Sequence, residues 1–193
     1  MKKLVLVTLL AACTLATSEA QTKKYDIKSG IITFQTSGEA LGVTTTMKSI
    51  VYFDDYGVKE CKETYEGDVL KESFFSDGKN LYGVYFADKM AVKQGVARRG
   101  TEFQFNWNEI SDKDKKAGKA KQLPGLTVAG KKCESFEYSD AGTTTKYAGW
   151  SRICLLADLT SKDLHSVTRA VKLEENAKVS GDKFAVPAGF AMQ

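Results

Sequence analysis

The sequence predicts a mainly antiparallel β protein of the α+β class, either a sheet, a sandwich or a barrel, with one short helix. Short runs of β-branched and aromatic residues recur about every eight to twelve positions and are separated by turns rich in Gly and Asp, a spacing typical of all-β folds. A doubly wound α/β fold would need long helical runs between the strands. Such runs are missing from the sequence.

In the first half of the chain, the strands are predicted from these apolar runs. Asp77-Gly78 lies between two of them and favours a tight hairpin, because Asp and Gly accept the positive φ angles that such a turn needs. This register places Phe74 opposite Leu81. The expected strands span residues 25–28, 31–34, 43–53, 58–65, 69–75 and 81–86.

One interval departs from the β pattern. Residues 106–117 contain good helix formers with early acids, and Gly118 follows them, so we expect one short helix that ends near this glycine. The β pattern then resumes after Pro124. The expected strands are 130–138 and 144–156, as the two arms of a hairpin, and 167–173 and 183–186, as closing strands.

The N-terminus is typical of a secretory signal peptide over residues 1–20. A basic start precedes an apolar run that is too short to span a bilayer, and small residues lead up to Ala20. Cleavage there leaves residues 21–193 as a single β-rich domain, which we expect to be periplasmic or secreted.

A second signal competes with this cleavage site. Residues 10–13 read Leu-Ala-Ala-Cys and resemble a bacterial lipobox. In that case the signal covers residues 1–12 and Cys13 carries a lipid, so the protein would be lipid-anchored in the bacterial envelope. Both alternatives place the protein outside the cytoplasm.

Three cysteines follow the leader, and export permits disulfides. If the predicted hairpin turns between Thr143 and Thr144, Cys133 faces Cys154 at a separation that a disulfide can span. A slip of one residue would send the two side chains to opposite faces, so a pair of buried free thiols is the alternative. Cys61 is expected to stay unpaired as a small buried residue.

Composition excludes some classes of partner. The formal net charge of +4 is too small for a nucleic-acid binder, which needs a dense basic face. Hydrophobic residues make up 42% of the chain, which supports a packed core. No apolar run after the signal is long enough for a transmembrane segment. Nothing in the sequence predicts the oligomeric state.

The motifs of common catalytic sites are missing. The chain has one histidine, His165, in a polar stretch, and it lacks HExxH, paired CxxC, a G-x-S-x-G elbow and phosphate-binding loops. We therefore predict a non-enzymatic protein with no catalytic residues, metal or cofactor. An enzyme that uses Cys61 or a pair of acids brought together in space is the less favoured alternative.

Aromatic side chains are abundant on the predicted strands. In a strongly curved sheet, some of them would line a cavity for an apolar ligand. In a closed sandwich or barrel they would form the core instead. The candidates for contact with an apolar ligand are Phe34, Phe53, Phe86, Trp107 and Trp150.

Three segments, YDIKSGIITF (25–34), VAGKKCESFEY (128–138) and FAVPAGF (184–190), together resemble uncharacterised bacterial envelope proteins related to the lipoprotein-carrier (LolA-like) superfamily. The resemblance implies a curved, incomplete β-barrel or half-barrel with a short helix near its mouth. It also implies that the concavity binds an apolar ligand such as lipid or lipoprotein acyl chains. The alternative is a structural or protein-interaction module of the envelope with a fully packed core and an envelope protein as its partner.

Overall fold

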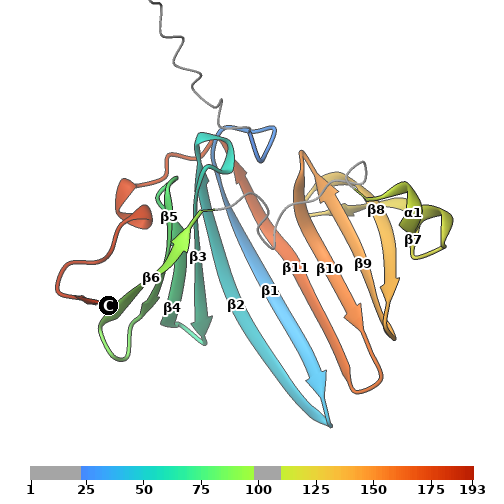
Figure 1. The fold of residues 1–193 in the computed structure, drawn as a ribbon, viewed down its shortest axis with the longest axis horizontal. Helices are drawn as coiled ribbons and strands as arrows, with labels where there is room; N and C mark the ends of the chain where they lie inside the picture. The colour runs from blue at the N-terminus through green and yellow to red at the C-terminus, as the bar shows by residue number, and fades with distance from the viewer. Residues whose placement is uncertain (1–22, 98–109) are drawn as a thin grey trace, which may run out of the picture.

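The computed structural model describes residues 23–97 and 110–193, whose strands form one sheet (Figure 1). The sheet has twelve strands in the order β12-β6-β5-β4-β3-β2-β1-β11-β10-β9-β8-β7. Every neighbouring pair is antiparallel except β12 and β6. The sheet bends without closing on itself, so the predicted antiparallel β class and the incomplete barrel are both confirmed.

The strands before residue 98 form a chain of hairpins. They are β1 (Gly30–Ala40), β2 (Val43–Asp54), β3 (Lys59–Glu66), β4 (Val69–Ser76), β5 (Asn80–Tyr85) and β6 (Met90–Val96), with the 3-10 helix η1 (Asp55–Gly57) between β2 and β3. Those after residue 109 are β7 (Ala120–Val128), β8 (Lys131–Asp140), β9 (Thr143–Trp150), β10 (Ile153–Thr160), β11 (Leu164–Glu175) and β12 (Ala191–Met192), with the 3-10 helix η3 (Gly181–Phe184) before β12.

Strand β1 joins the two halves of the sheet. Its side chains alternate as a strand with one buried face requires: Ile32 and Phe34 are buried, whereas Gln35 and Ser37 are exposed. On one side β1 pairs with its hairpin partner β2, and on the other with β11 from the far end of the chain. A bulge in this second pairing, beside Phe34, adds to the bend of the sheet.

The two faces of the sheet carry separate apolar clusters. We call the face that carries Phe34 the inner face, and the opposite one, which carries Tyr52, the outer face. The inner-face cluster includes Phe53, against which Tyr25 packs edge-on with ring centroids 4.9 Å apart. The outer-face cluster is covered by the C-terminal segment, which contributes Phe184.

The predicted helix is present as α1 (Asp112–Lys116), the one α-helix of residues 23–97 and 110–193. The Ser111 hydroxyl caps it by accepting a hydrogen bond from the Asp114 backbone N–H at 3.1 Å. Gly118, with φ of +73°, follows the helix end, as predicted. Residues 106–109 of the predicted helical interval lie outside the described residues.

The predicted disulfide is wrong, because its predicted hairpin register is wrong. The expected single arm over 144–156 turns at Ser151 and Arg152, with φ of +50° and +64°, and divides into β9 and β10. Cys133 on β8 is therefore separated from Cys154 on β10 by a whole strand, which places them about 9 to 10 Å apart across the sheet. This is beyond the reach of a disulfide, and both thiols are free, as is that of Cys61.

Three further local predictions are also wrong. Residues 25–28, expected as a strand, form bends before β1 begins at Gly30. The hairpin after β4 has a longer loop than expected, because Asp77 Oδ1 accepts hydrogen bonds from the backbone N–H groups of residues 79 and 80. Phe74 consequently pairs with Gly83 rather than with Leu81, a shift of two residues that keeps every side chain on its predicted face. The expected closing strand at 183–186 begins in η3 instead.

Candidate functional site

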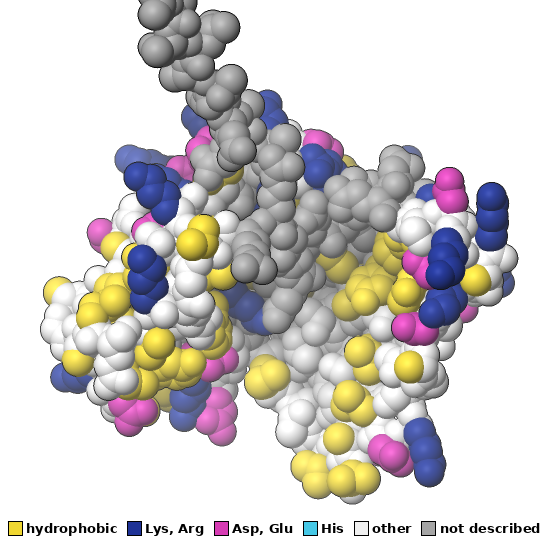
Figure 2. Space-filling view, viewed as in Figure 1, with side chains coloured by type: hydrophobic (Ala, Val, Ile, Leu, Met, Phe, Trp, Pro, Cys, Tyr) yellow, Lys and Arg dark blue, Asp and Glu magenta, His cyan; other side chains and the backbone are white. Residues whose placement is uncertain are grey.

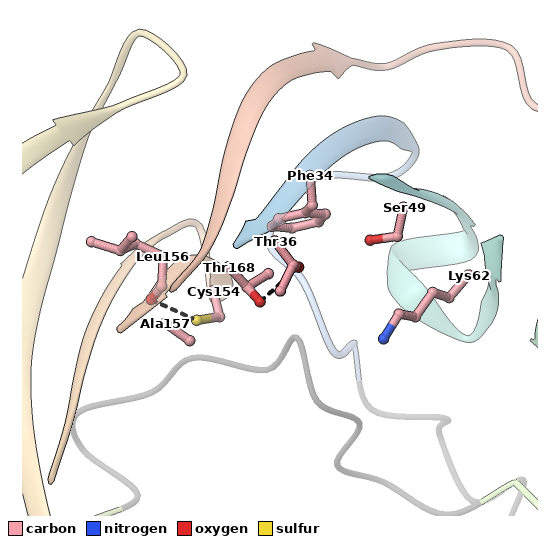
Figure 3. A pocket seen from close by; sticks show the side chains of 8 residues that line it. All are labelled: Phe34, Thr36, Ser49, Lys62, Cys154, Leu156, Ala157 and Thr168. Carbon is pink, nitrogen blue, oxygen red and sulfur yellow. Dashed lines mark hydrogen bonds between the residues drawn. The ribbon is translucent and has the colours of Figure 1, made fainter. Parts of the chain in front are cut away.

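The inner face of the sheet holds a hollow of about 150 Å³ at the junction of its two halves (Figure 3). Its walls come from five strands, β1, β2, β3, β10 and β11. The residues that line it are Phe34, Thr36, Ser49, Lys62, Cys154, Leu156, Ala157 and Thr168.

Strand pairing brings these distant residues together. Phe34 lies opposite Ser49 on β2, and Thr36 lies opposite Thr168 on β11. Residues directly opposite each other project from the same face of a sheet. The two threonine hydroxyls share a hydrogen bond of 2.9 Å, which ties β1 to β11 beside the hollow. Ala157 follows as the partner of Thr168 on the next strand.

Cys154 contributes an inert apolar wall. Its Sγ–H donates to the backbone carbonyl of Leu156 at 3.2 Å. Burial raises the pKa of the Cys154 thiol to about 12, so the thiol stays protonated at neutral pH. Since the thiolate is the nucleophilic form, this side chain behaves as a small hydrophobic group.

Lys62 is the charged side chain among the described residues that line the hollow. It extends from β3, on the opposite side from Cys154 (Figure 3). The aliphatic stem of a lysine can lie along apolar surface while its charge meets water or an anionic group. The hollow thus combines an apolar wall on the β10 side with a cation on the β3 side.

The five aromatic residues predicted to contact a ligand do not gather at this hollow. Phe34 lines it. Phe53 is completely buried in the inner-face core, and Phe86 packs on Phe190 on the outer face, with ring centroids 5.3 Å apart. Trp150 has the Lys131 ammonium 4.6 Å from its ring centroid. Trp107 lies outside the described residues.

The remaining lining residues were missed at the sequence level. Serine, threonine, alanine and lysine give no sign of a site by themselves. They meet only because β1 pairs with β11 across more than a hundred residues, and single-sequence patterns carry no information about such a pairing.

Two buried carboxylates have structural partners. Glu60 forms a hydrogen-bonded ion pair with Lys24 and accepts a hydrogen bond of 2.9 Å from the Tyr25 hydroxyl. Burial is the largest cause that lowers the pKa of Lys24, and attraction to Glu60 opposes it. Glu63 lies on the outer face, opposite to the Glu60 side chain. The two acids therefore do not form a pair that could act together in hydrolysis.

Glu63 fastens the C-terminal segment to the sheet. Its Oε2 accepts hydrogen bonds from the Tyr52 hydroxyl at 3.1 Å and the Tyr65 hydroxyl at 2.7 Å. Its Oε1 accepts from the ammonium of Lys183, in η3. Burial and the Glu63 charge raise the pKa of both phenols, so the tyrosines remain donors over the whole physiological pH range.

Other chemistry is sparse in the described part of the chain. His165 lies at an exposed strand end, where its ring nitrogen is 3.0 Å from an Asp158 carboxylate oxygen. Within residues 23–97 and 110–193, no three His, Cys, Asp or Glu side chains group as metal ligands do. None of the helices in these ranges is both long and apolar enough to cross a bilayer.

Comparison of the structure with solved structures finds the same fold elsewhere. An uncharacterised conserved protein from Thermus thermophilus matches with a TM-score of 0.58 at 7% identity, over 90% of this chain and 94% of that one. MucB matches with a TM-score of 0.51 at 16% identity, over 88% of this chain. This chain spans 62% of MucB, and the Pseudomonas aeruginosa MucA/MucB complex gives a TM-score of 0.50 at 14% identity.

A LolA superfamily protein from Nitrosomonas europaea is also similar, with a TM-score of 0.43 at 9% identity over 86% of this chain and 94% of that one. The predicted resemblance to LolA-like proteins is confirmed as a similarity of fold. No family model matches the chain. No curated protein matches it either.

Proposed function

We propose that this chain is a non-enzymatic protein of the cell envelope that holds an apolar ligand, such as a lipid or lipoprotein acyl chain, against the inner face of its sheet. One observation carries the proposal: the bent sheet leaves a hollow with one apolar side, at Phe34, Cys154 and Ala157. Lys62 at the opposite side suits the anionic end of such a ligand.

The size of the hollow limits what it can hold. A volume of about 150 Å³ equals that of about five water molecules in the liquid, so it takes a segment of an acyl chain. Burial of about five methylene groups, at about 0.8 kcal/mol each, contributes about 4 kcal/mol. This alone corresponds to a dissociation constant of about 1 mM. A tighter ligand must also contact the inner face beyond the hollow.

The test is to fill the hollow. Ala157→Trp places a large side chain on a strand, where tryptophan is tolerated, and in the space that the ligand would occupy. Ala188→Trp makes the same change at an exposed turn. Mature wild-type protein would be extracted for mass spectrometry and titrated with a fluorescent fatty acid. We expect Ala157→Trp to lose binding at least about tenfold, and Ala188→Trp to bind as the wild type does.

A second candidate function is a protein-interaction module. The similarity of fold to MucB, which is also known in a MucA/MucB complex, favours this alternative. It predicts that wild-type extracts contain no lipid and that Ala157→Trp and wild type behave identically toward the fatty acid. Either result would contradict the acyl-chain proposal.

We also propose that the protein works outside the cytoplasm, as the basic and apolar leader over residues 1–20 suggests. The mass of the mature N-terminus distinguishes cleavage after Ala20 from lipid attachment at Cys13. A chain that keeps its leader in the producing bacterium would contradict both.

A further inference from the structure

A basic row crosses the outer face of three neighbouring strands. Gln35 on β1 lies opposite Lys48 on β2 and opposite Arg169 on β11. Directly opposed residues share a face, so two cations flank one amide. Thr36, the next residue of β1, projects to the inner face beside the hollow described above. The row therefore belongs to a different surface.

A surface hollow of about 490 Å³ surrounds this row. Its volume falls within the range of about 300 to 1,000 Å³ that small-molecule sites occupy. Besides the row, it presents the hydroxyl residues Ser37 and Thr46. None of the described residues that line it is an Asp or a Glu.

The cations have only weak partners outside the hollow. Arg169 donates to the neutral backbone carbonyl of Thr127 at 3.2 Å. Lys48 lies 4.8 Å from the ring centroid of Tyr65 and 3.5 Å from Asp68, whose side chain is fully exposed. Ion pairs of this exposed kind contribute little. Both side chains can therefore leave these weak partners for an anion that binds over Gln35.

We propose that the outer hollow binds a phosphate group between Lys48 and Arg169. The guanidinium group matches phosphate oxygens through two parallel hydrogen bonds, and the ammonium group adds a point charge from the other side. The amide of Gln35 supplies a neutral donor between them. The phosphate belongs either to a lipid headgroup or to free phosphate, and Val171 at the edge, which is 48% exposed, offers apolar contact to a lipid. This site does not depend on the acyl-chain proposal.

The first arm of the test uses inorganic phosphate. Calorimetric titration at low salt would compare the wild type with Lys48→Met, which keeps the apolar stem over Tyr65, and with Arg169→Gln. We expect each variant to lose affinity about tenfold, the effect of about 1.4 kcal/mol. Arg169→Lys should fall between Arg169→Gln and the wild type, because it keeps the charge and loses the paired donors. Lys79→Met, at an exposed turn outside the hollow, is the charge-matched control and should bind normally.

The second arm uses sedimentation with vesicles of phosphatidylcholine alone or with phosphatidylglycerol added. Binding of phosphate and of the anionic vesicles, both weakened in Lys48→Met and Arg169→Gln, supports a lipid headgroup. Binding of phosphate alone supports free phosphate. If the wild type binds neither, or if these variants bind as Lys79→Met does, the proposal is overturned. Thermal melts of each variant confirm that the compared proteins are folded.

Discussion

The attachment of the C-terminal segment leads to a sharp prediction for Glu63→Gln. Glu63 is 5% exposed and receives two tyrosine hydroxyls and the Lys183 ammonium. Glutamine has nearly the same shape but carries no charge, and its amide nitrogen cannot accept a hydrogen bond. The substitution therefore removes the ion pair and leaves one of the three donors without an acceptor, while apolar packing is kept.

The expected cost is about 2 kcal/mol. Removal of one partner from a fully buried ion pair costs about 3 to 5 kcal/mol. The Lys183 side chain is 33% exposed, so water takes up part of its charge in the variant, and this lowers the cost. For a domain of this size, each kcal/mol shifts the Tm by about 2 to 4 °C. We expect Glu63→Gln to lower the Tm by about 4 to 8 °C.

Calorimetry would measure the Tm, and hydrogen exchange would show where the structure loosens. Backbone amides in the C-terminal segment 180–193 should exchange faster, because Lys183 no longer holds η3 to β3. Glu134→Gln, at an exposed position of β8, is the matched control and should change neither quantity. A Tm shift below about 1 °C in Glu63→Gln, or equal shifts in both variants, would refute the reasoning.

Three further predictions concern single positions. Burial raises the pKa of Cys61 from 9.0 to about 12. The contribution of this thiol to the free energy of unfolding is therefore complete below pH 9 and is lost as the pH rises toward 12. Denaturation curves recorded between about pH 8 and 11 should show that the free energy of unfolding falls less steeply with pH in Cys61→Ala than in the wild type. Gly30→Ala would place a Cβ 2.6 Å from the Phe53 ring, and urea denaturation should show a loss of about 1 to 3 kcal/mol in the free energy of unfolding. In Gly38→Ala the nearest atom to the new Cβ lies at 3.6 Å, so the loss should be far smaller. Leu41 is 87% exposed at the tip of the β1–β2 hairpin, where hydrophobic side chains meet solvent (Figure 2), and its φ is +51°. Because glycine adopts such a φ without strain, Leu41→Gly should stabilise the protein by about 1 kcal/mol. A lower Tm in this variant would contradict the prediction.

Features that depend on neighbouring residues could be predicted from the sequence. The alternation of Ile32 and Phe34 with polar residues marks β1 because one face of this strand is buried. The helix was predicted because good helix formers with early acidic residues precede Gly118. In both cases the physical cause lies within about ten residues.

Features that depend on distant residues or on backbone strain could not be predicted from the sequence. The turn at Ser151 and Arg152 has two positive φ angles without a glycine, so no usual turn signal divides β9 from β10, and the error carried over to the cysteine pairing. The inner hollow could not be predicted for a related reason. Phe34 was named as a candidate for its aromatic ring, whereas Thr168 joins it only through the pairing of β1 with β11.

The short strand β12 has a practical consequence for handling the protein. It lies parallel to β6, with hydrogen bonds from the Gln193 N–H to the Ala91 carbonyl and from the Lys93 N–H to the Gln193 carbonyl. Three residues thereby occupy part of a sheet edge that would otherwise offer open donors and acceptors to another chain. Removal of residues 191–193, or a bulky fusion placed directly behind them, should therefore promote association of molecules through β6. A purification tag is safer on the N-terminal side of β1.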